Sequence, residues 1–222
     1  MGGIVVFGAG GRAGRAVTAE ARGRGLEVTA VVRDPARYPD LAAEGVTVVR
    51  GDVTDAGATG AVARGRVAAV HAVSPFSGPE PGFDALDPDF FVKAADALLD
   101  GLAEAGVGRL VAVGLFADLL GTDGQPVMDD PVAFPAAIRP FALAHTAGLA
   151  RLRAAGDGGV DWVVLTPGGG LEQDAPRTGR YRLGGERAPG GAQVLSYADL
   201  AVAVLDEIET PTRHRTRVSV LS

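Results

Sequence analysis

Short apolar runs and helical patterns alternate along the whole chain. The apolar runs have the length of buried strands, and the stretches between them repeat apolar positions every three or four residues, as helices do. The pattern predicts strands over 3–7, 27–32, 46–50, 67–73, 109–113, 161–165 and 216–221 and helices over 12–24, 36–44, 88–105, 135–155 and 197–208. This alternation predicts an α/β fold with one doubly wound parallel sheet. No repeat or linker divides residues 1–222, so we expect a single domain.

Two of the predicted helices have specific start signals. Asp87 and Pro88 predict the N-cap and the first position of helix 88–105. Ser196 and Asp199 have the spacing of a capping box at the start of helix 197–208.

Three long segments follow the carboxyl ends of the fourth, fifth and sixth predicted strands, at residues 74–87, 114–134 and 167–194. Ligands of open α/β sheets bind beyond these strand ends, so we expect the segments to form a substrate pocket. Proline and phenylalanine are frequent in the first segment, and Phe116 and Leu119 lie in the second, which favours an apolar or aromatic small-molecule substrate. The alternative is that these side chains only pack the segments onto the domain.

The first predicted strand runs into a glycine turn that opens a helix. Gly8 permits a tight turn, Gly11 lets the backbone approach a phosphate, and Gly14 lets the helix pack close to the strand. Free amides at the helix start, together with the positive end of the helix dipole, then face the phosphates. The turn therefore predicts a site for the pyrophosphate of a dinucleotide.

Two arginines lie where the adenosine ribose of such a dinucleotide would be. Arg33 is at the carboxyl end of the second predicted strand, and Arg12 is inside the glycine turn. An acidic residue at the strand end suits the 2′-hydroxyl of NAD, whereas a basic one suits the 2′-phosphate of NADP. The pair favours NADP(H) as cofactor; the alternative is that both are ordinary solvated residues.

Composition narrows the functional classes further. The chain has no cysteine, which excludes disulfides and thiolate chemistry, and its three scattered histidines predict no metal site. A net charge of −6 without a basic block argues against a nucleic-acid partner. No apolar run is long enough to span a membrane, so we expect a soluble, cytoplasmic protein. A monomer and a homodimer are both compatible with this composition.

Four motifs together resemble a known superfamily. They are the glycine turn with Arg12, residues 31–35 (VVRDP), residues 51–55 (GDVTD) and residues 196–201 (SYADLA). The chain resembles the atypical short-chain dehydrogenases/reductases and, among them, the NAD(P)H-binding, NmrA-like group that includes candidate flavin reductases. The resemblance covers nearly the whole chain and implies a Rossmann-type fold.

The resemblance also implies cofactor-binding roles. Gly8, Gly11 and Gly14, with Ala13 at the same helix start, would hold the pyrophosphate, and the two arginines would hold the 2′-phosphate. The residues that would line the adenine, ribose and nicotinamide are Asp52, Val53, Ala72, Val73, Ser74, Gly114, Pro167 and Gly168. For Asp52 the alternative is an ordinary turn residue.

The catalytic Tyr/Lys pair of ordinary short-chain dehydrogenases is missing. Their chemistry needs a tyrosine that donates a proton and a lysine four residues later that lowers its pKa. Lys93 is the only lysine, and Asp89, which we expect to pair with it, lies four residues before it. The helix after the fifth strand instead has Phe141 and His145 at this spacing.

If these residues replace the pair, His145 points toward the nicotinamide and, titrating near neutral pH, donates a proton or a hydrogen bond to the substrate. Otherwise it is an ordinary helix histidine. We interpret His71 as structural, and His214 and the 129–130 acidic pair as solvated.

These features favour an NADPH-dependent reductase that transfers hydride to a flavin, a quinone or another conjugated small molecule. Such acceptors delocalise the incoming electron pair, so solvent can supply the proton. One alternative is a non-catalytic, NADP(H)-sensing NmrA-like regulator, which the missing pair favours and the three long segments disfavour. Another is a redox-neutral isomerase, dehydratase or cyclase on the same fold.

Overall fold

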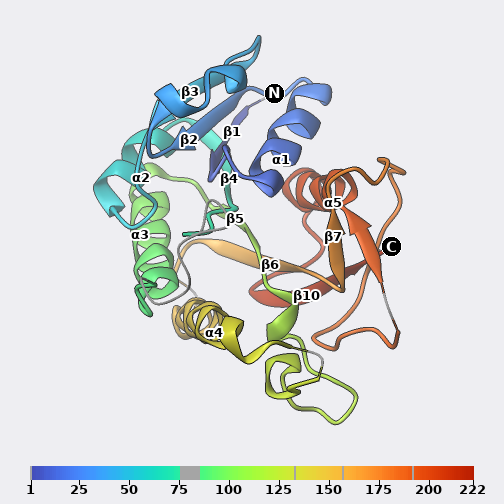
Figure 1. The fold of residues 1–222 in the computed structure, drawn as a ribbon. Coiled ribbons are helices and arrows are strands. Elements are labelled where there is room, and N and C mark those ends of the chain that lie inside the picture. Colours follow the sequence, from blue (N-terminus) through green and yellow to red (C-terminus); the bar gives the residue numbers. More distant parts are fainter. Residues whose placement is uncertain (1, 76–85, 133, 157, 192) are drawn as a thin grey trace.

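The computed structural model describes residues 2–75, 86–132, 134–156, 158–191 and 193–222. Their strands form a sheet of 8 strands in the order β3-β2-β1-β4-β5-β6-β10-β8 (Figure 1). In that order the strands are Val46–Arg50, Val28–Val32, Gly3–Phe7, Arg66–His71, Arg109–Val113, Asp161–Pro167, Thr216–Leu221 and Arg182–Leu183. Every pairing is parallel except that of β8 with β10. The predicted doubly wound parallel sheet is therefore confirmed.

Helices cover both faces of this sheet (Figure 1). Helices α1 (Arg12–Gly23) and α5 (Tyr197–Glu209) pack their apolar residues onto one face. Helices α2 (Ala56–Ala63), α3 (Phe90–Ala105) and α4 (Arg139–Ala154) cover the other face. Strands β1 and β2 are buried along their whole length, which explains why they are continuous apolar runs without alternation.

Strand β1 lies between β2 and β4, so the chain leaves it toward one side of the sheet and later returns on the other. This reversal makes the carboxyl end of β1 the topological switch point, where open α/β sheets bind ligands.

The predicted helix over 36–44 is wrong. Two short 3-10 turns, Pro35–Arg37 and Pro39–Leu41, occupy this segment. Proline lacks an amide donor and forces the residue before it out of the helical region, and Tyr38 before Pro39 accordingly has φ −133°. Helix α2, in contrast, was not predicted, because its alanines and glycines form no apolar stripe.

Two helix starts differ in detail from the sequence prediction. Helix α3 begins at Phe90 with Asp89 as N-cap, not at Pro88 with Asp87. The Asp87 carboxylate instead accepts the amide of Asp89 (3.0 Å) and pairs with Lys93 (2.6 Å), so the expected pairing of Lys93 with Asp89 is also wrong. Helix α4 begins only after the 3-10 turn Ala136–Ile138.

The 167–194 segment contains secondary structure that the sequence did not predict. In addition to β8, it forms β7 (Gly170–Glu172), which pairs with β9 (Val194–Ser196) in a second, 2-stranded sheet. At the start of α5, Ser196 caps the helix by accepting the Asp199 amide (2.9 Å), as predicted. The Asp199 carboxylate does not complete a capping box, because it accepts the amides of Thr178 and Gly179 (2.9 and 2.7 Å).

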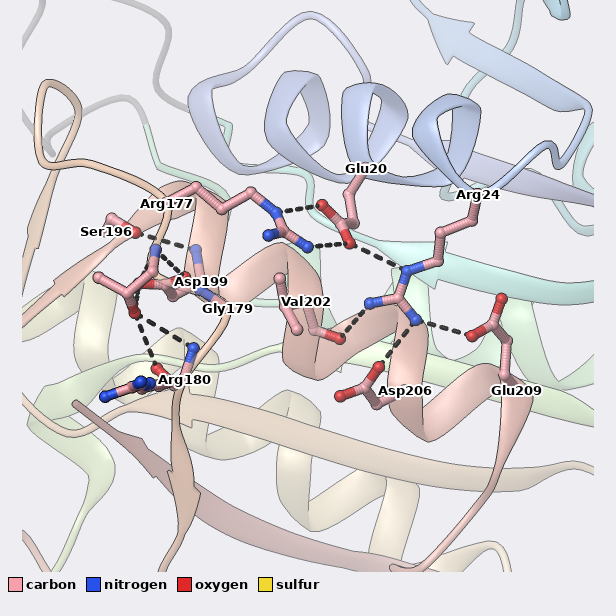
Figure 2. A network of polar contacts seen from close by, with 11 residues as sticks. Glu20, Arg24, Arg177, Gly179, Arg180, Ser196, Asp199, Val202, Asp206 and Glu209 are labelled. Carbon is pink, nitrogen blue, oxygen red and sulfur yellow. Dashed lines mark hydrogen bonds and ion pairs between the residues drawn. The ribbon is translucent and has the colours of Figure 1, made fainter.

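A chain of ion pairs joins α1 to α5 and to this segment (Figure 2). Glu20 on α1 accepts hydrogen bonds from Arg177 (2.8 Å) and Arg24 (2.9 Å). Arg24 continues to Asp206 and Glu209 on α5, at 2.7 Å each. Hydrogen bonding from Arg177 is the main cause that lowers the pKa of Glu20. These contacts hold the far end of the helix that begins at the glycine turn.

A second ionic cluster lies at the amino ends of β5 and β6. Arg109 is only 7% exposed and pairs with Glu207 of α5 (2.9 Å) and with Asp161 (2.6 Å). Glu207 is 2% exposed and also accepts the amide of Thr212 (3.1 Å). The cluster joins α5 to the amino edge of the sheet.

We expect Arg109→Met to destabilise the protein by about 3 kcal/mol, because it leaves the buried Glu207 carboxylate without its cation. The free energy of unfolding in urea measures this loss. The matched control is Arg64→Met, which breaks the exposed pair of Arg64 with Glu104 and should cost less than about 1 kcal/mol. Equal losses of unfolding free energy in the two variants would contradict the prediction that a buried ion pair is costlier to break than an exposed one.

Candidate functional site

The glycine turn has the close packing that its sequence predicts. Gly8 follows β1 with φ +82°, and a Cβ there would lie 2.6 Å from the carbonyl oxygen of Ala72. A Cβ on Gly14 would lie 2.1 Å from the carbonyl oxygen of Gly8. Only glycine fits at either position, so α1 starts in direct contact with the end of β1.

Gly11 differs from these two glycines because it faces open space. It is exposed, and its added Cβ would meet only the Gly8 oxygen, at 3.5 Å. As N-cap of α1 it offers no side-chain cap, and the first turn of the helix, which includes Ala13, has no acidic residue. The amides of the first turn can therefore bind an anion. The turn fits the pyrophosphate of a dinucleotide on this geometry.

Arg12 and Arg33 lie next to the turn. The amides of Gly8 and Ala9 donate to the carbonyl of Val31 (3.1 and 3.3 Å), which places the end of β2 beside it. Both arginine side chains are exposed, and no residue in the described part of the chain pairs with either. They are available to a phosphate at this edge.

Tyr38 and Arg15 pack against the outside of the turn. The sequence analysis did not identify either residue. A Cβ on Gly10 would lie 2.5 Å from the Tyr38 ring, so the ring packs directly on the turn. The Arg15 side chain lies over that ring, donates to the Gly10 carbonyl (3.1 Å) and pairs with Asp40. An aromatic residue after a strand end is the only signal that could have indicated this contact.

Asp52 and Val53 follow β3. The Asp52 carboxylate accepts the amide (3.0 Å) and the hydroxyl (2.8 Å) of Thr54, which is the turn role that the sequence left as an alternative. Val53 is 4% exposed and belongs to the core with Phe7 and Val31. Contact of either residue with an adenine stays a prediction.

The remaining predicted cofactor residues lie along the carboxyl edge of the sheet. The amide of Ala72 bonds to Phe7 (2.9 Å), and Val73 and Ser74 continue the chain beyond β4. Gly114 follows β5 and bonds to Leu165 (2.9 Å). Strand β6 is longer than predicted and includes Pro167, and Gly168 follows it. Most of the 74–87 segment, residues 76–85, lies outside the described residues.

A small cavity opens at this edge between the sheet and helices α3 and α4. Its volume of about 40 Å³ has room for roughly three water molecules. Phe91, Leu149 and Leu152 contribute to its apolar wall. Its polar lining residues are His71, Asp118, His145, Thr166 and Arg217.

His145 lines this cavity together with Gly114. That its ring points toward a nicotinamide stays a prediction. Its ring packs on Phe91, with ring centroids 3.7 Å apart, and meets Phe141 edge-on. Burial, with a smaller contribution from His71, lowers the pKa of His145 to about 3. The expected titration near neutral pH is therefore wrong, and the His145 ring is neutral near pH 7.

His71 is more than the structural residue that the sequence predicts, because it also lines the cavity. Burial lowers its pKa to about 4. Its Nδ1 is buried and has no hydrogen-bond partner among the described residues. One residue of the cavity lining therefore has a buried nitrogen without a hydrogen bond from the described residues.

Asp118 and Arg217 complete the polar lining, and sequence reasoning missed both. Asp118 is 7% exposed and accepts the Thr146 hydroxyl (2.8 Å), and burial raises its pKa to about 6. Arg217 is 5% exposed and donates to the backbone carbonyl of Asp118. A charged residue inside the last apolar strand could have indicated Arg217. Nothing in the sequence singles out Asp118 among the acidic residues of its segment.

The other polar groups named from the sequence lie elsewhere. Asp129 pairs with Arg139, and His214 lies 2.8 Å from an Asp161 oxygen. Among the described residues, no three His, Asp or Glu side chains gather as metal ligands. None of the helices in that part of the chain is long and apolar enough to cross a membrane.

Comparisons with known proteins agree with this geometry. A family model described as NAD(P)H-binding matches residues 8–211. The uncharacterised protein YwnB of Bacillus subtilis (strain 168) is 32% identical over an alignment of 226 positions. The alignment covers 99% of this chain and 98% of YwnB.

Solved structures are similar over equally long spans. A candidate epimerase from Bacteroides thetaiotaomicron has a TM-score of 0.84 at 30% identity, covering 99% of this chain and 96% of that one. A candidate NADH-flavin reductase from Streptococcus pneumoniae TIGR4 has a TM-score of 0.81 at 27% identity, covering all of both chains. With the family model, these likenesses show that the chain belongs to the NAD(P)H-binding, NmrA-like family of atypical short-chain dehydrogenases/reductases.

Proposed function

We propose that the protein is an NADPH-dependent reductase that transfers hydride to a flavin, a quinone or another conjugated small molecule. The observation that carries the proposal is the position of the cavity relative to the glycine turn. Both lie at the carboxyl edge of the sheet, and β1 and β5 are separated only by β4. Two strand spacings, roughly 10 Å, suit a dinucleotide whose pyrophosphate is at the turn and whose nicotinamide is near Gly114.

The residues at this edge have distinct roles in the proposed reaction. The turn and the amides of α1 bind the pyrophosphate, and Arg12 and Arg33 bind the 2′-phosphate. The bound nicotinamide supplies a hydride. The cavity beside Gly114 is too small for a flavin or quinone ring, so the ring would stack on the nicotinamide outside it, and only a small polar group of the substrate would enter between Phe91 and the other apolar wall residues.

The missing Tyr/Lys pair supports an acceptor that stabilises its own charge. Lys93 pairs with Asp87 at an exposed site. The chain's three tyrosines all lie in the described part, and none of them lines the cavity. Flavins and quinones delocalise the incoming electron pair, so their reduction does not need the Tyr/Lys pair as its proton source.

A redox-neutral reaction is the second candidate, favoured by the 30% identity to the candidate epimerase. Net consumption of NADPH when FMN, menadione or an enone is supplied separates the two. Bound cofactor with no consumption would favour the redox-neutral reaction or the non-catalytic, NADP(H)-sensing regulator.

Gly11→Ala tests the pyrophosphate site without disturbing the fold. The backbone of Gly11 (φ −79°, ψ 170°) is allowed for alanine, and its Cβ would meet no close protein atom. The added methyl would meet the phosphates, so calorimetry should show NADPH affinity at least about tenfold weaker at an unchanged melting temperature. Unchanged NADPH affinity would contradict the proposed binding of the pyrophosphate at the turn.

Arg33→Ala tests the choice of cofactor. Loss of a charge-assisted hydrogen bond to the 2′-phosphate should weaken NADPH about 10- to 100-fold and leave NADH nearly unchanged, as measured by calorimetric titration. The control is Arg64→Ala. It also removes an exposed arginine, but Arg64 is not part of the turn and pairs with Glu104. Equal losses for the two cofactors would contradict the NADP assignment.

A further inference from the structure

The cavity lining includes a buried acidic residue, Asp118, to which the family resemblance assigns no role. Asp118 belongs to the 3-10 turn Phe116–Asp118, which follows β5 and Gly114. The residue is 7% exposed and lines the same cavity as His145. Asp118 therefore lies at the small cavity beside Gly114, next to which the proposed function places the nicotinamide and the reacting group of the substrate.

The contacts of Asp118 are compatible with both its charged and its neutral form. The Thr146 hydroxyl lies 2.8 Å from Oδ1 of Asp118 and 3.1 Å from the carbonyl oxygen of Ala142. A hydroxyl has one proton to donate and can also accept. Thr146 can donate to the ionised carboxylate, or accept from the protonated acid while donating to Ala142. A proton can therefore leave and return to Asp118 without loss of a hydrogen bond.

The charged groups around Asp118 leave its carboxylate without a direct ion pair. Arg217 on β10 donates to the backbone carbonyl of Asp118, and its Nη2 lies 3.5 Å from Glu186. Arg153 on α4 also pairs with Glu186. Desolvation is consequently the largest influence on the acid, and it raises the pKa of Asp118 to about 6.

The two imidazoles of the cavity cannot take over this role. Burial lowers the pKa of His71 to about 4 and that of His145 to about 3, so both rings are neutral near pH 7. A neutral imidazole is a poor proton donor, although it can hydrogen-bond a substrate oxygen.

We infer that Asp118 donates the proton that accompanies hydride transfer, with Thr146 as its positioning residue, and that the substrate is a carbonyl compound or quinone. The inference rests on the proposed reductase function. The hydride would leave a C–H bond of the reduced nicotinamide, which would be oxidised to NADP⁺, and would form a bond to the substrate. An electron pair of the C=O group would move onto oxygen. The Asp118 O–H bond breaks, and its proton forms an O–H bond on that oxygen. The carboxylate accepts the Thr146 hydroxyl and regains its proton from water.

The test follows the pH dependence of kcat/KM for menadione at saturating NADPH. The donor must be protonated, so the rate should be highest below about pH 6 and fall about tenfold per pH unit above it. Asp118→Asn should lose this descending limb and react about 100-fold more slowly at pH 5.5, with NADPH affinity within twofold of wild type.

Thr146→Val is the second variant. Because the Thr146 hydrogen bond lowers the pKa of Asp118, its loss should move the descending limb to higher pH. If Asp118→Asn fails to fold, the shift of the descending limb in Thr146→Val tests the role of Asp118 by itself. Asp129→Asn is the matched control on the same segment, where Asp129 forms a surface pair with Arg139, and should keep the wild-type profile.

A readout without cofactor or substrate complements the kinetics. Infrared titration should show the C=O stretch of a protonated carboxyl that disappears around pH 6 and is absent in Asp118→Asn. A flat rate profile, an unmoved limb in Thr146→Val, or no such band overturns the role of Asp118 alone. Bound NADPH that reduces none of menadione, FMN and an aromatic enone overturns the reductase as well.

Discussion

The close approach of α1 to β1 is the constraint on which the site depends. No side chain fits between Gly14 and the carbonyl of Gly8, so the helix starts against the strand end with its free amides at the carboxyl edge of the sheet. The ion pairs of Glu20 and Arg24 hold the other end of the same helix to α5 and to Arg177 (Figure 2). The direction of α1 is therefore determined at both ends, and with it the position of the free amides at its start.

The sequence was informative about the fold wherever a signal was local and continuous. The apolar runs of β1 and β2 are buried on both faces, so their composition alone identifies them. Pro39 overrode an apparent helical pattern over 36–44, and α2 had no pattern to read because alanine and glycine form no stripe. Strands β7 and β9 pair only with each other across more than 20 residues, and such pairing leaves little trace in either short strand.

The candidate site also has one part with a local sequence signal, the glycine turn, and one part without it, the cavity. Gly8, Gly11 and Gly14 lie within seven consecutive residues, so their spacing could be interpreted directly. Asp118 and Arg217 come from distant segments and meet only because β5, β6 and β10 are neighbours in the sheet. The protonation state of His145 depends on burial against Phe91, which spacing cannot reveal.

The Arg109 cluster lies at the amino ends of β5 and β6, whereas the cavity opens at their carboxyl ends. The groups that secure these central strands are therefore separated from the groups that line the cavity by the length of the strands. Exposed positions of the 114–134 segment, such as Asp123 and Gln125, can be randomised in a directed-evolution library without touching that ionic anchor, whereas the buried Asp118 and Leu119 are kept. The fold thus offers a scaffold in which new substrate preferences can be sought at one edge while the opposite edge preserves the folded state.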